Sequence, residues 1–262
     1  MKAPRAEKRL GQHFLTDLRV VQRQVGYARL TGAETVLEIG PGPGVLTRAL
    51  AAALPEGRVV ALEIDPRMIQ HLQADLPANV ELRLADATEA TLPAFDRCVS
   101  NLPYNVSTPI AFRLLDAGKP CVLMFQKEFA DRLVAEVGSD DYSRLSVEAA
   151  YRADVELLER VPPGAFSPPP KVTSALVRVT PRPPKFTVAD EALFHGVVEA
   201  AFSERRKKLG NALSSARGLL PPRYRSADFA AVPHAGERAE QVPPEGFGAV
   251  ANHLVASRDE PR

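Results

Sequence analysis

The chain has 262 residues, of which 45% are hydrophobic and 25% charged, and its formal net charge is +1. These values are typical of a globular protein with one large core, or one main domain and a small addition. No run of about 20 apolar residues and no signal peptide is recognisable, so we expect no membrane association and a cytoplasmic location. Cys98 and Cys121 lie in expected core strands, away from His and Asp clusters, which favours reduced packing residues and argues against a metal site.

The small net charge hides two basic segments. Residues 1–29 carry seven basic and two acidic side chains, and residues 204–225 carry seven basic and one acidic, which gives net charges of +5 and +6. Two such segments in a nearly neutral protein indicate surfaces for a polyanion. Either segment alone would more simply be a solvated face.

From Thr35 onward, strand patterns alternate with helical patterns. The expected strands are 35–39, 58–64, 80–85, 95–101 and 121–125, and the expected helices are 45–54, 66–76, 109–117 and 129–137. Two β-rich stretches follow, 145–161 and 172–180, joined by the proline-rich segment 162–170. This order predicts an α/β, Rossmann-like fold: a mostly parallel sheet covered by helices, with antiparallel strands at one edge.

Residues 181–184 read Pro-Arg-Pro-Pro and are expected to be a linker. Beyond it the patterns are helical only, over 189–201, 205–216 and 246–256. We therefore expect a main domain at 1–182, including a basic N-terminal arm at 1–30, and a small all-helical domain at 183–262. A monomer is the expected state.

A glycine-rich loop, Glu38 to Gly44, follows the first of these strands and precedes the first helix. This is the position of the nucleotide-binding loop in doubly wound folds. The dinucleotide fingerprint is incomplete, and Pro41 and Pro43 lack the N–H groups that would hold a phosphate. The loop therefore favours a ligand with an adenosine but no pyrophosphate, such as S-adenosylmethionine.

Acidic residues end the next two strands. Glu63 is placed to accept hydrogen bonds from ribose hydroxyls, and Asp86 to meet the amino group of an adenine. Each also has a simpler explanation, a strand-end charge for Glu63 and a helix N-cap for Asp86. Glu63 would suit a dehydrogenase equally well, so it does not discriminate.

Asn101-Leu102-Pro103-Tyr104 ends a buried strand, where ligands of α/β sheets bind. The Asn101 amide oxygen and the Leu102 carbonyl can accept hydrogen bonds from an exocyclic amino group, and the Tyr104 ring can stack on a flipped-out base. The alternative is a turn that terminates the strand, since Asn and Pro both favour turns.

These motifs resemble the ribosomal RNA adenine dimethyltransferase family over nearly the whole chain. Besides the glycine loop, Glu63, Asp86 and the 101–104 motif, the matching segments are 11–15, 142–147, 161–172 and 201–208. The resemblance implies a class I methyltransferase that uses S-adenosylmethionine to dimethylate two adjacent adenines near the 3′ end of small-subunit (16S) rRNA. The implied partner is this rRNA in an immature 30S particle during ribosome biogenesis.

The resemblance also implies roles for individual residues. The implied cofactor-binding residues are His13, Leu15, Gly40, Gly42, Glu63, Asp86 and Asn101. The implied catalytic set is Asn101, Leu102, Pro103, Tyr104 and Phe166, with Tyr104 and Phe166 on the two faces of the target base. Arg205, Arg206, Lys207 and Lys208 are the implied RNA-binding cluster. His13 stands where the family often has asparagine, and its ring can still donate a hydrogen bond there.

Three other functions remain possible from the sequence. An antibiotic-resistance methyltransferase acting on large-subunit rRNA would share the catalytic core, but the matches at 145–182 and in the C-terminal part argue against it. A DNA adenine methyltransferase would more often have proline in place of Leu102. An RNA-binding assembly factor without activity would not need Asn101, Glu63 and Asp86 together.

Overall fold

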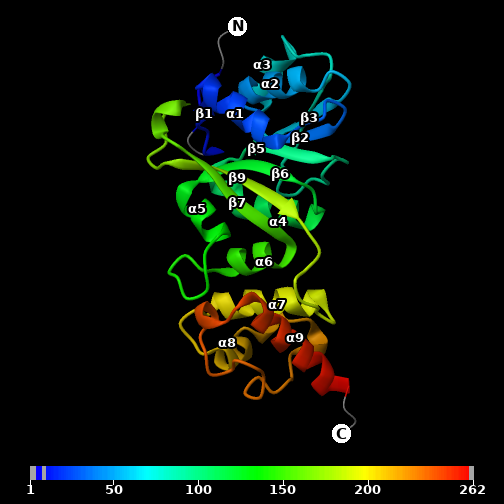
Figure 1. Cartoon of the computed structure of the whole chain (residues 1–262), viewed down its shortest axis with the longest axis vertical. Helices are drawn as coiled ribbons and strands as arrows, with labels where there is room; N and C mark the ends of the chain where they lie inside the picture. The colour runs from blue at the N-terminus through cyan, green and yellow to red at the C-terminus, as the bar shows by residue number, and fades with distance from the viewer. Residues whose placement is uncertain (1–3, 8–9, 260–262) are drawn as a thin grey trace. The chain divides into compact units, whose positions relative to one another are not determined.

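The computed structural model of the chain describes residues 4–7 and 10–259 (Figure 1). The chain forms two compact units. The first contains residues 1–130 and 154–181, and the second contains residues 131–153 and 182–262. The last crossing between the units lies beside the expected boundary at residue 183, but nothing in the sequence pattern set residues 131–153 apart from the first unit.

The first unit contains a seven-stranded sheet with the strand order β4-β3-β2-β5-β6-β9-β7. The strands are β2 (Thr35–Ile39), β3 (Arg58–Glu63), β4 (Val80–Leu84), β5 (Arg97–Asn101), β6 (Cys121–Gln126), β7 (Ala153–Val161) and β9 (Ser174–Pro181). The pairs β3–β4, β2–β3, β2–β5 and β5–β6 are parallel, whereas β9 pairs antiparallel with β6. The expected fold class is thus confirmed.

A second, two-stranded sheet joins distant parts of the sequence. Its strands are β1 (Phe14–Leu15) and β8 (Phe166–Ser167), paired antiparallel with Phe14 opposite Ser167 and Leu15 opposite Phe166. This pairing ties the N-terminal segment to the proline-rich loop after β7.

The helices of the first unit follow the expected order, with one addition. They are α1 (Leu18–Ala28), α2 (Val45–Ala53), α3 (Pro66–Gln73), α4 (Ser107–Ala117) and α5 (Lys127–Leu133), whose end crosses into the second unit; the short 3₁₀ turns are Tyr104–Val106 and Pro163–Ala165. Helix α1 was not expected within the N-terminal arm. Asp17 caps it by accepting a hydrogen bond from the Arg19 N–H, and Val20, Val21 and Gln24 are buried on one face.

Alternating strand residues form the core of the first unit. Val36 on β2, Val59 and Ala61 on β3, and Val99 on β5 share one apolar cluster with buried residues of α1 and α2. Because side chains alternate between the two faces of a strand, this spacing fixes which face of the sheet these helices cover.

The second unit is helical, with α6 (Arg144–Arg152), α7 (Glu191–Ser203), α8 (Leu209–Ser215) and α9 (Pro244–Asp259) and 3₁₀ turns at Arg217–Leu219, Pro222–Tyr224 and Ala239–Gln241. None of the helices in the described ranges is long and apolar enough to span a membrane. The core of this unit gathers side chains from α6, α7, α8 and α9.

The expectation of a strand over 145–152 is wrong, because these residues form α6. Ser143 and Ser146 close a capping box at its start, with the Ser143 N–H donating to Ser146 Oγ at 3.0 Å. Val147 and Tyr151, four residues apart, then lie on one helical face and are buried in the core of the second unit. Their alternating apolar pattern is compatible with either structure, and packing decides it.

The helix expected from residue 205 begins later, at Leu209. The basic residues before it lie in turns, and Lys208 forms an isolated antiparallel bridge with Arg238. The Leu209 N–H donates to the Glu237 carbonyl at 2.7 Å, which holds the segment against a neighbouring loop instead of in a helix.

The strand order places a candidate site between β2 and β5. From β2 the chain winds outward through β3 and β4 on one side, and then continues through β5 and β6 on the other. The loops after β2 and β5 therefore open away from each other and leave a crevice at the carboxyl ends of the parallel strands. Ligands of doubly wound folds bind at such a switch point.

Candidate active site

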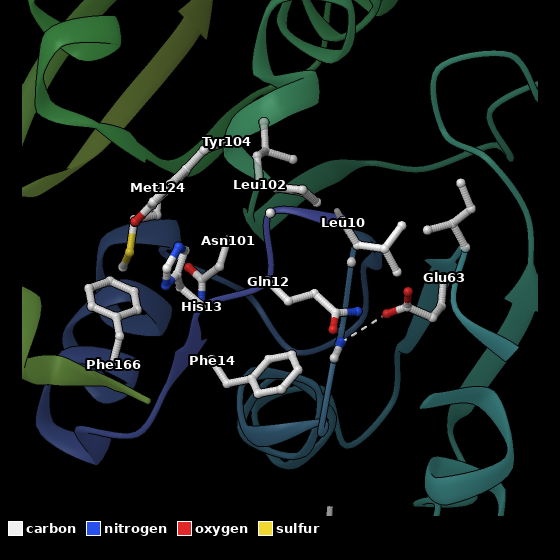
Figure 2. A pocket seen from close by; sticks show the side chains of 15 residues that line it. Leu10, Gln12, His13, Phe14, Glu63, Asn101, Leu102, Tyr104, Met124 and Phe166 are labelled. Atoms are coloured by element: carbon white, nitrogen blue, oxygen red, sulfur yellow. Dashed lines mark hydrogen bonds between the residues drawn. The ribbon is translucent and has the colours of Figure 1, made fainter. Parts of the chain in front are cut away.

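A pocket lies at this switch point, with a cavity of about 60 Å³ (Figure 2). It gathers nine residues expected from the sequence: His13, Gly40, Gly42, Glu63, Asn101, Leu102, Pro103, Tyr104 and Phe166. The other lining residues are Leu10, Gly11, Gln12, Phe14, Ile64 and Met124. Residues as far apart in the sequence as His13 and Phe166 thus meet around one cavity within the first unit.

Asn101 presents an unused acceptor to this pocket. It is the last residue of β5, and its Oδ1 is buried without a hydrogen-bond partner among the described residues. The next residue, Leu102, is 2% exposed, and its N–H donates to the Met124 carbonyl at 3.3 Å. A buried acceptor without a partner costs about 1–3 kcal/mol, so a ligand N–H at this position would recover that cost.

The Tyr104 side chain is held at its hydroxyl group and by the backbone turn that contains it. Its hydroxyl shares a hydrogen bond with the hydroxyl of Ser174, and burial raises the pKa of Tyr104. The Pro103 carbonyl accepts from the Val106 N–H at 3.2 Å and from Ser107 Oγ at 3.1 Å, which forms the turn that leads into α4. The aromatic face is therefore held at the pocket wall by β9 and by this turn.

The glycine loop has no amide left for a phosphate. Pro41 and Pro43 have no N–H, and the remaining three amides of residues 40–44 are used inside the protein. The Gly40 N–H donates to the Leu62 carbonyl at 2.9 Å, that of Gly42 to Glu63 Oε2 at 3.1 Å, and that of Gly44 to the Pro41 carbonyl at 3.0 Å. The residues present thus fit an adenosine ligand without a pyrophosphate.

Glu63 ends β3 below this loop and is 4% exposed. Its carboxylate accepts from the Gly42 N–H and, at 2.9 Å, from the Asp65 N–H. Burial raises the pKa of Glu63, whereas these two hydrogen bonds oppose the increase. A carboxylate has about four lone-pair sites, so two remain for ligand hydroxyls.

Asp86 lies in an adjoining hollow of about 80 Å³, which also has Gly40, Glu63 and Pro103 in its wall. Its Oδ1 accepts from the N–H and the hydroxyl of Thr88, at 2.8 and 2.6 Å, and these bonds lower the pKa of the Asp86 carboxyl. The carboxylate therefore organises the turn after β4, as a cap would, and still lines the hollow.

The N-terminal segment from Leu10 to Leu15, called the strap below, covers the pocket. His13 Nδ1 lies 2.9 Å from the Pro168 carbonyl, and the imidazole stacks on Tyr104 with ring centroids 5.7 Å apart and planes 26° from parallel. Leu15, expected at the cofactor, is 5% exposed and packs in the core of the first unit; it is not a lining residue of the pocket. Phe166 belongs both to this core and to the pocket wall.

Sequence reasoning missed two groups beside the site. Gln12 donates from Nε2 to Asp65 Oδ2 at 3.0 Å, which fastens the strap to the start of α3. Glu38, on β2, is 1% exposed, and burial raises its pKa to about 8, with the Thr47 hydroxyl and the Glu63 carboxylate beside it. The sequence signal that could have identified Glu38 is its carboxyl group in the middle of an otherwise apolar strand.

The basic cluster 205–208 belongs to the second unit and divides into two kinds of side chain. Arg205 is paired with Glu240 at 2.9 Å, and Lys207 with Glu204 at 3.2 Å. Arg206 and Lys208 are exposed, and neither has an ion pair or side-chain hydrogen bond within the part of the chain that the structure describes. Across residues 4–7 and 10–259, no group of three or more His, Cys, Asp and Glu side chains is arranged to hold a metal.

Comparisons with known proteins point in one direction. A model of a family described as ribosomal RNA adenine dimethylase matches residues 3–222. A protein from Methanosarcina barkeri, described as a probable ribosomal RNA small subunit methyltransferase A, is 42% identical over 249 residues, which cover 93% of this chain and 86% of the relative. A protein of the same description from Natronomonas pharaonis is 46% identical over 259 residues, covering 94% and 92%.

Two solved structures resemble the fold along most of its length. A dimethyladenosine transferase from Plasmodium falciparum superposes with a TM-score of 0.77 at 27% identity, covering 93% of this chain and 98% of that one. The 23S rRNA methyltransferase ErmE gives 0.65 at 30% identity, covering 92% and 99%. With a family model that matches most of its length and relatives above 40% identity, the chain belongs to the ribosomal RNA adenine dimethylase family and is an S-adenosylmethionine-dependent rRNA adenine dimethyltransferase.

Proposed function

We propose that the chain dimethylates two adjacent adenines near the 3′ end of small-subunit rRNA, within an immature 30S particle in the cytoplasm. The observation that carries the base-binding part of this proposal is the buried Oδ1 of Asn101, which has no hydrogen-bond partner among the described residues and shares a pocket with the ring of Tyr104. The choice of the small subunit rests on the names of the relatives, since the descriptions of both curated proteins refer to it.

The cofactor is proposed to lie across the pocket and the adjoining hollow, which share Leu10, Gly40, Glu63, Ile64 and Pro103. S-adenosylmethionine, when bound, supplies a reactive methyl group on a positively charged sulfur. Glu63 would accept hydrogen bonds from the ribose hydroxyls, and the turn organised by Asp86 would contact the adenine end. The glycines of the loop allow close approach because they have no side chain.

Asn101 and Leu102 are proposed to act on the target amino group. An adenine amino group is a poor nucleophile because its lone pair is delocalised into the ring. Hydrogen bonds from its two N–H groups to Asn101 Oδ1 and to the Leu102 carbonyl would favour a pyramidal nitrogen and direct its lone pair at the methyl carbon. Transfer would form the N–C bond while the bond between sulfur and the methyl carbon breaks, which would leave neutral S-adenosylhomocysteine, and the methylated nitrogen would release one proton to water. The protein contributes position and electrostatics, and no strong base is required because this proton becomes acidic once the new bond forms.

Tyr104 and Phe166 are proposed to hold the flipped base. The Tyr104 ring is fixed by Ser174, and the Phe166 backbone is fixed by pairing with Leu15. Stacking on an aromatic ring contributes about 1–3 kcal/mol per base, which is comparable with the cost of unstacking the base from RNA. Stacking between two fixed rings would therefore offset the free-energy cost of flipping the base out of the RNA.

A large-subunit target is the second candidate, and one observation favours it. The 23S rRNA methyltransferase ErmE shares the fold at 30% identity over 92% of this chain, so the fold does not separate the two targets. The curated relatives have higher identity, and their descriptions refer to the small subunit, so we retain the small subunit as the proposal.

Methyl transfer to defined substrates tests the target. The protein is incubated with labelled cofactor and, separately, with immature 30S particles, 50S subunits or naked DNA. We expect label in the 30S particles only, and mass spectrometry of the rRNA should find dimethyladenine at two adjacent positions near the 3′ end. Label in the 50S subunits instead would favour the second candidate, and no label in any substrate would refute methyl transfer by this chain.

The second unit is proposed to bind rRNA backbone through Arg206 and Lys208, the two cations of its basic cluster that have no ion pair with a described residue. A cation that neutralises a phosphate releases counterions, so each contact steepens the salt dependence of binding. Arg206→Glu and Lys208→Glu should each weaken binding to 30S particles and reduce the slope of log K against log salt by about one.

The matched control for these variants is Lys119→Glu, which makes the same charge change at an exposed residue. Lys119 directly precedes Pro120 and β6, at the amino-terminal end of that strand, whereas the pocket lies at the carboxyl ends of the parallel strands. Its slope should equal that of the wild type, and cofactor affinity should stay unchanged in all three variants. Equal slopes for Arg206→Glu, Lys208→Glu and Lys119→Glu would refute the assignment. Arg205 is unsuitable for this test because its loss would break the pair with Glu240.

A further inference from the structure

The imidazole of His13 lies on the aromatic ring that the proposed function assigns to the target base. Its centroid is 5.7 Å from that of Tyr104, with the planes 26° from parallel, which is an offset stack. In Figure 2 the imidazole lies among the side chains of Asn101, Tyr104 and Phe166, and all four residues line the same pocket. A base stacked on this side of Tyr104 would have to occupy the same space.

The imidazole is held there by the backbone around it. A carbonyl oxygen can only accept a hydrogen bond, so the proton between His13 Nδ1 and the Pro168 carbonyl, 2.9 Å apart, belongs to Nδ1. The neighbouring residues Phe14 and Leu15 pair with β8, which ends at Ser167, directly before Pro168. The strap therefore presents the ring to Tyr104 with its backbone already fixed.

The imidazole occupies the Tyr104 side of the pocket, beside a cavity of about 60 Å³. Removing the imidazole would enlarge the cavity on the side of Tyr104 and Asn101. Entry of a base therefore requires displacement of His13, whereas the rings of Tyr104 and Phe166 can stay in place.

We propose that His13 is a plug that stands in for the target base and leaves the Tyr104 face when an unpaired adenine enters. This rests on the proposed function, because it takes Tyr104 as the stacking surface for that base. The plug is a specificity device. A base must make the stack with Tyr104 and also donate to Asn101 Oδ1, for which neither the imidazole nor another described residue is a hydrogen-bond partner. A base that only stacks on Tyr104 gains little binding free energy, because its stack replaces the one that His13 already makes.

Nuclear magnetic resonance of the histidine rings tests the displacement directly. In the free protein the ring current of Tyr104 should shift the His13 ring protons upfield, and Tyr104→Leu should remove that shift. Adding a single-stranded oligoadenylate with S-adenosylhomocysteine, which cannot donate a methyl group, should move the His13 signals to their Tyr104→Leu positions. His71 and His253, which line neither the pocket nor the adjoining hollow, are internal references.

Binding of the same oligoadenylate, compared with an otherwise identical oligomer containing one abasic position, gives a second measurement. At saturating S-adenosylhomocysteine, His13→Ala should increase the preference for the base over the abasic position by about three- to tenfold, the range expected from loss of one aromatic stack. His13→Phe keeps a ring on Tyr104 and should show no increase. Using the preference cancels any change in overall RNA affinity.

The outcomes separate this proposal from the proposed function. A preference for the base that Asn101→Ala abolishes, together with an unchanged His13 signal on binding, would refute the plug and leave the base site standing. An equal gain with His13→Ala and His13→Phe would also refute the plug. No preference for the base in the wild type and in His13→Ala would refute both the plug and the base site.

Discussion

Asn101→Ala is expected to lower kcat for methyl transfer by about 10²–10³-fold at saturating cofactor, the loss typical when one preorganised hydrogen-bonding group is removed from a reaction centre. The reason is geometric. Oδ1 is buried, has no partner among the described residues, and lies at the end of a strand whose next residue is anchored to β6 through the Met124 carbonyl. The measurement is the single-turnover rate of label transfer to 30S particles.

Asn101→Asp is the matched variant, because it keeps an acceptor oxygen of nearly the same shape. It should lose clearly less activity than Asn101→Ala, and both proteins should unfold at similar denaturant concentrations. Equal rates for the two variants, well below the wild type, would mean that the amide acts through something other than an acceptor oxygen. A wild-type rate for Asn101→Ala would remove the residue from the catalytic set.

Glu38→Gln should change how stability depends on pH. Burial raises the pKa of Glu38 to about 8 from its usual 4.5, so the folded state binds more protons than the unfolded state between these values. Its stabilising contribution is complete below about pH 4.5 and is lost as the pH rises through about 8. In that window the free energy of unfolding should fall by up to about 1.4 kcal/mol per pH unit because of this residue.

Glutamine has the shape of the protonated carboxyl but no titration, so the variant should gain stability relative to the wild type as the pH rises from about 5 to about 8. Urea unfolding at a series of pH values measures this difference. Glu56→Gln is the matched control, because it makes the same substitution at an exposed residue near the start of β3. A flat difference for Glu38→Gln would mean that its carboxyl is ionised in the folded state.

Much of the first unit could be predicted because strand and helix patterns there are long and consistent. Val59 lies in a continuous apolar run, residues 59–62, as expected of a strand buried on both faces. Val36 and Val99 lie in shorter apolar runs, which Glu38 and the pair Asp96-Arg97 interrupt. The order of these strands placed the glycine loop and Asn101 at the same sheet edge. The pocket itself could not be predicted in full, because it depends on the pairing of β1 with β8. That pairing joins residues about 150 positions apart and leaves no local pattern in the sequence.

The failures have local causes that only packing resolves. Leu145 to Tyr151 alternates like a strand, but Val147 and Tyr151 become one helical face once a second core is available. Helix α1 was hidden by its charge, since Arg19 and Arg23 made residues 1–30 look like a solvated arm. Arg23 in fact pairs with Glu159 at 2.6 Å, so part of that charge is balanced within the first unit.

The route of the chain between its units has a consequence for the order in which a newly made chain can fold. Residues 131–153 emerge from the ribosome before residues 182–262, yet Tyr142, Val147 and Tyr151 are buried against partners in that later segment. These three side chains have no such partners while about 30 further residues, which belong to the first unit, are being made. Folding of the second unit therefore stays incomplete during synthesis until its last helix has been made.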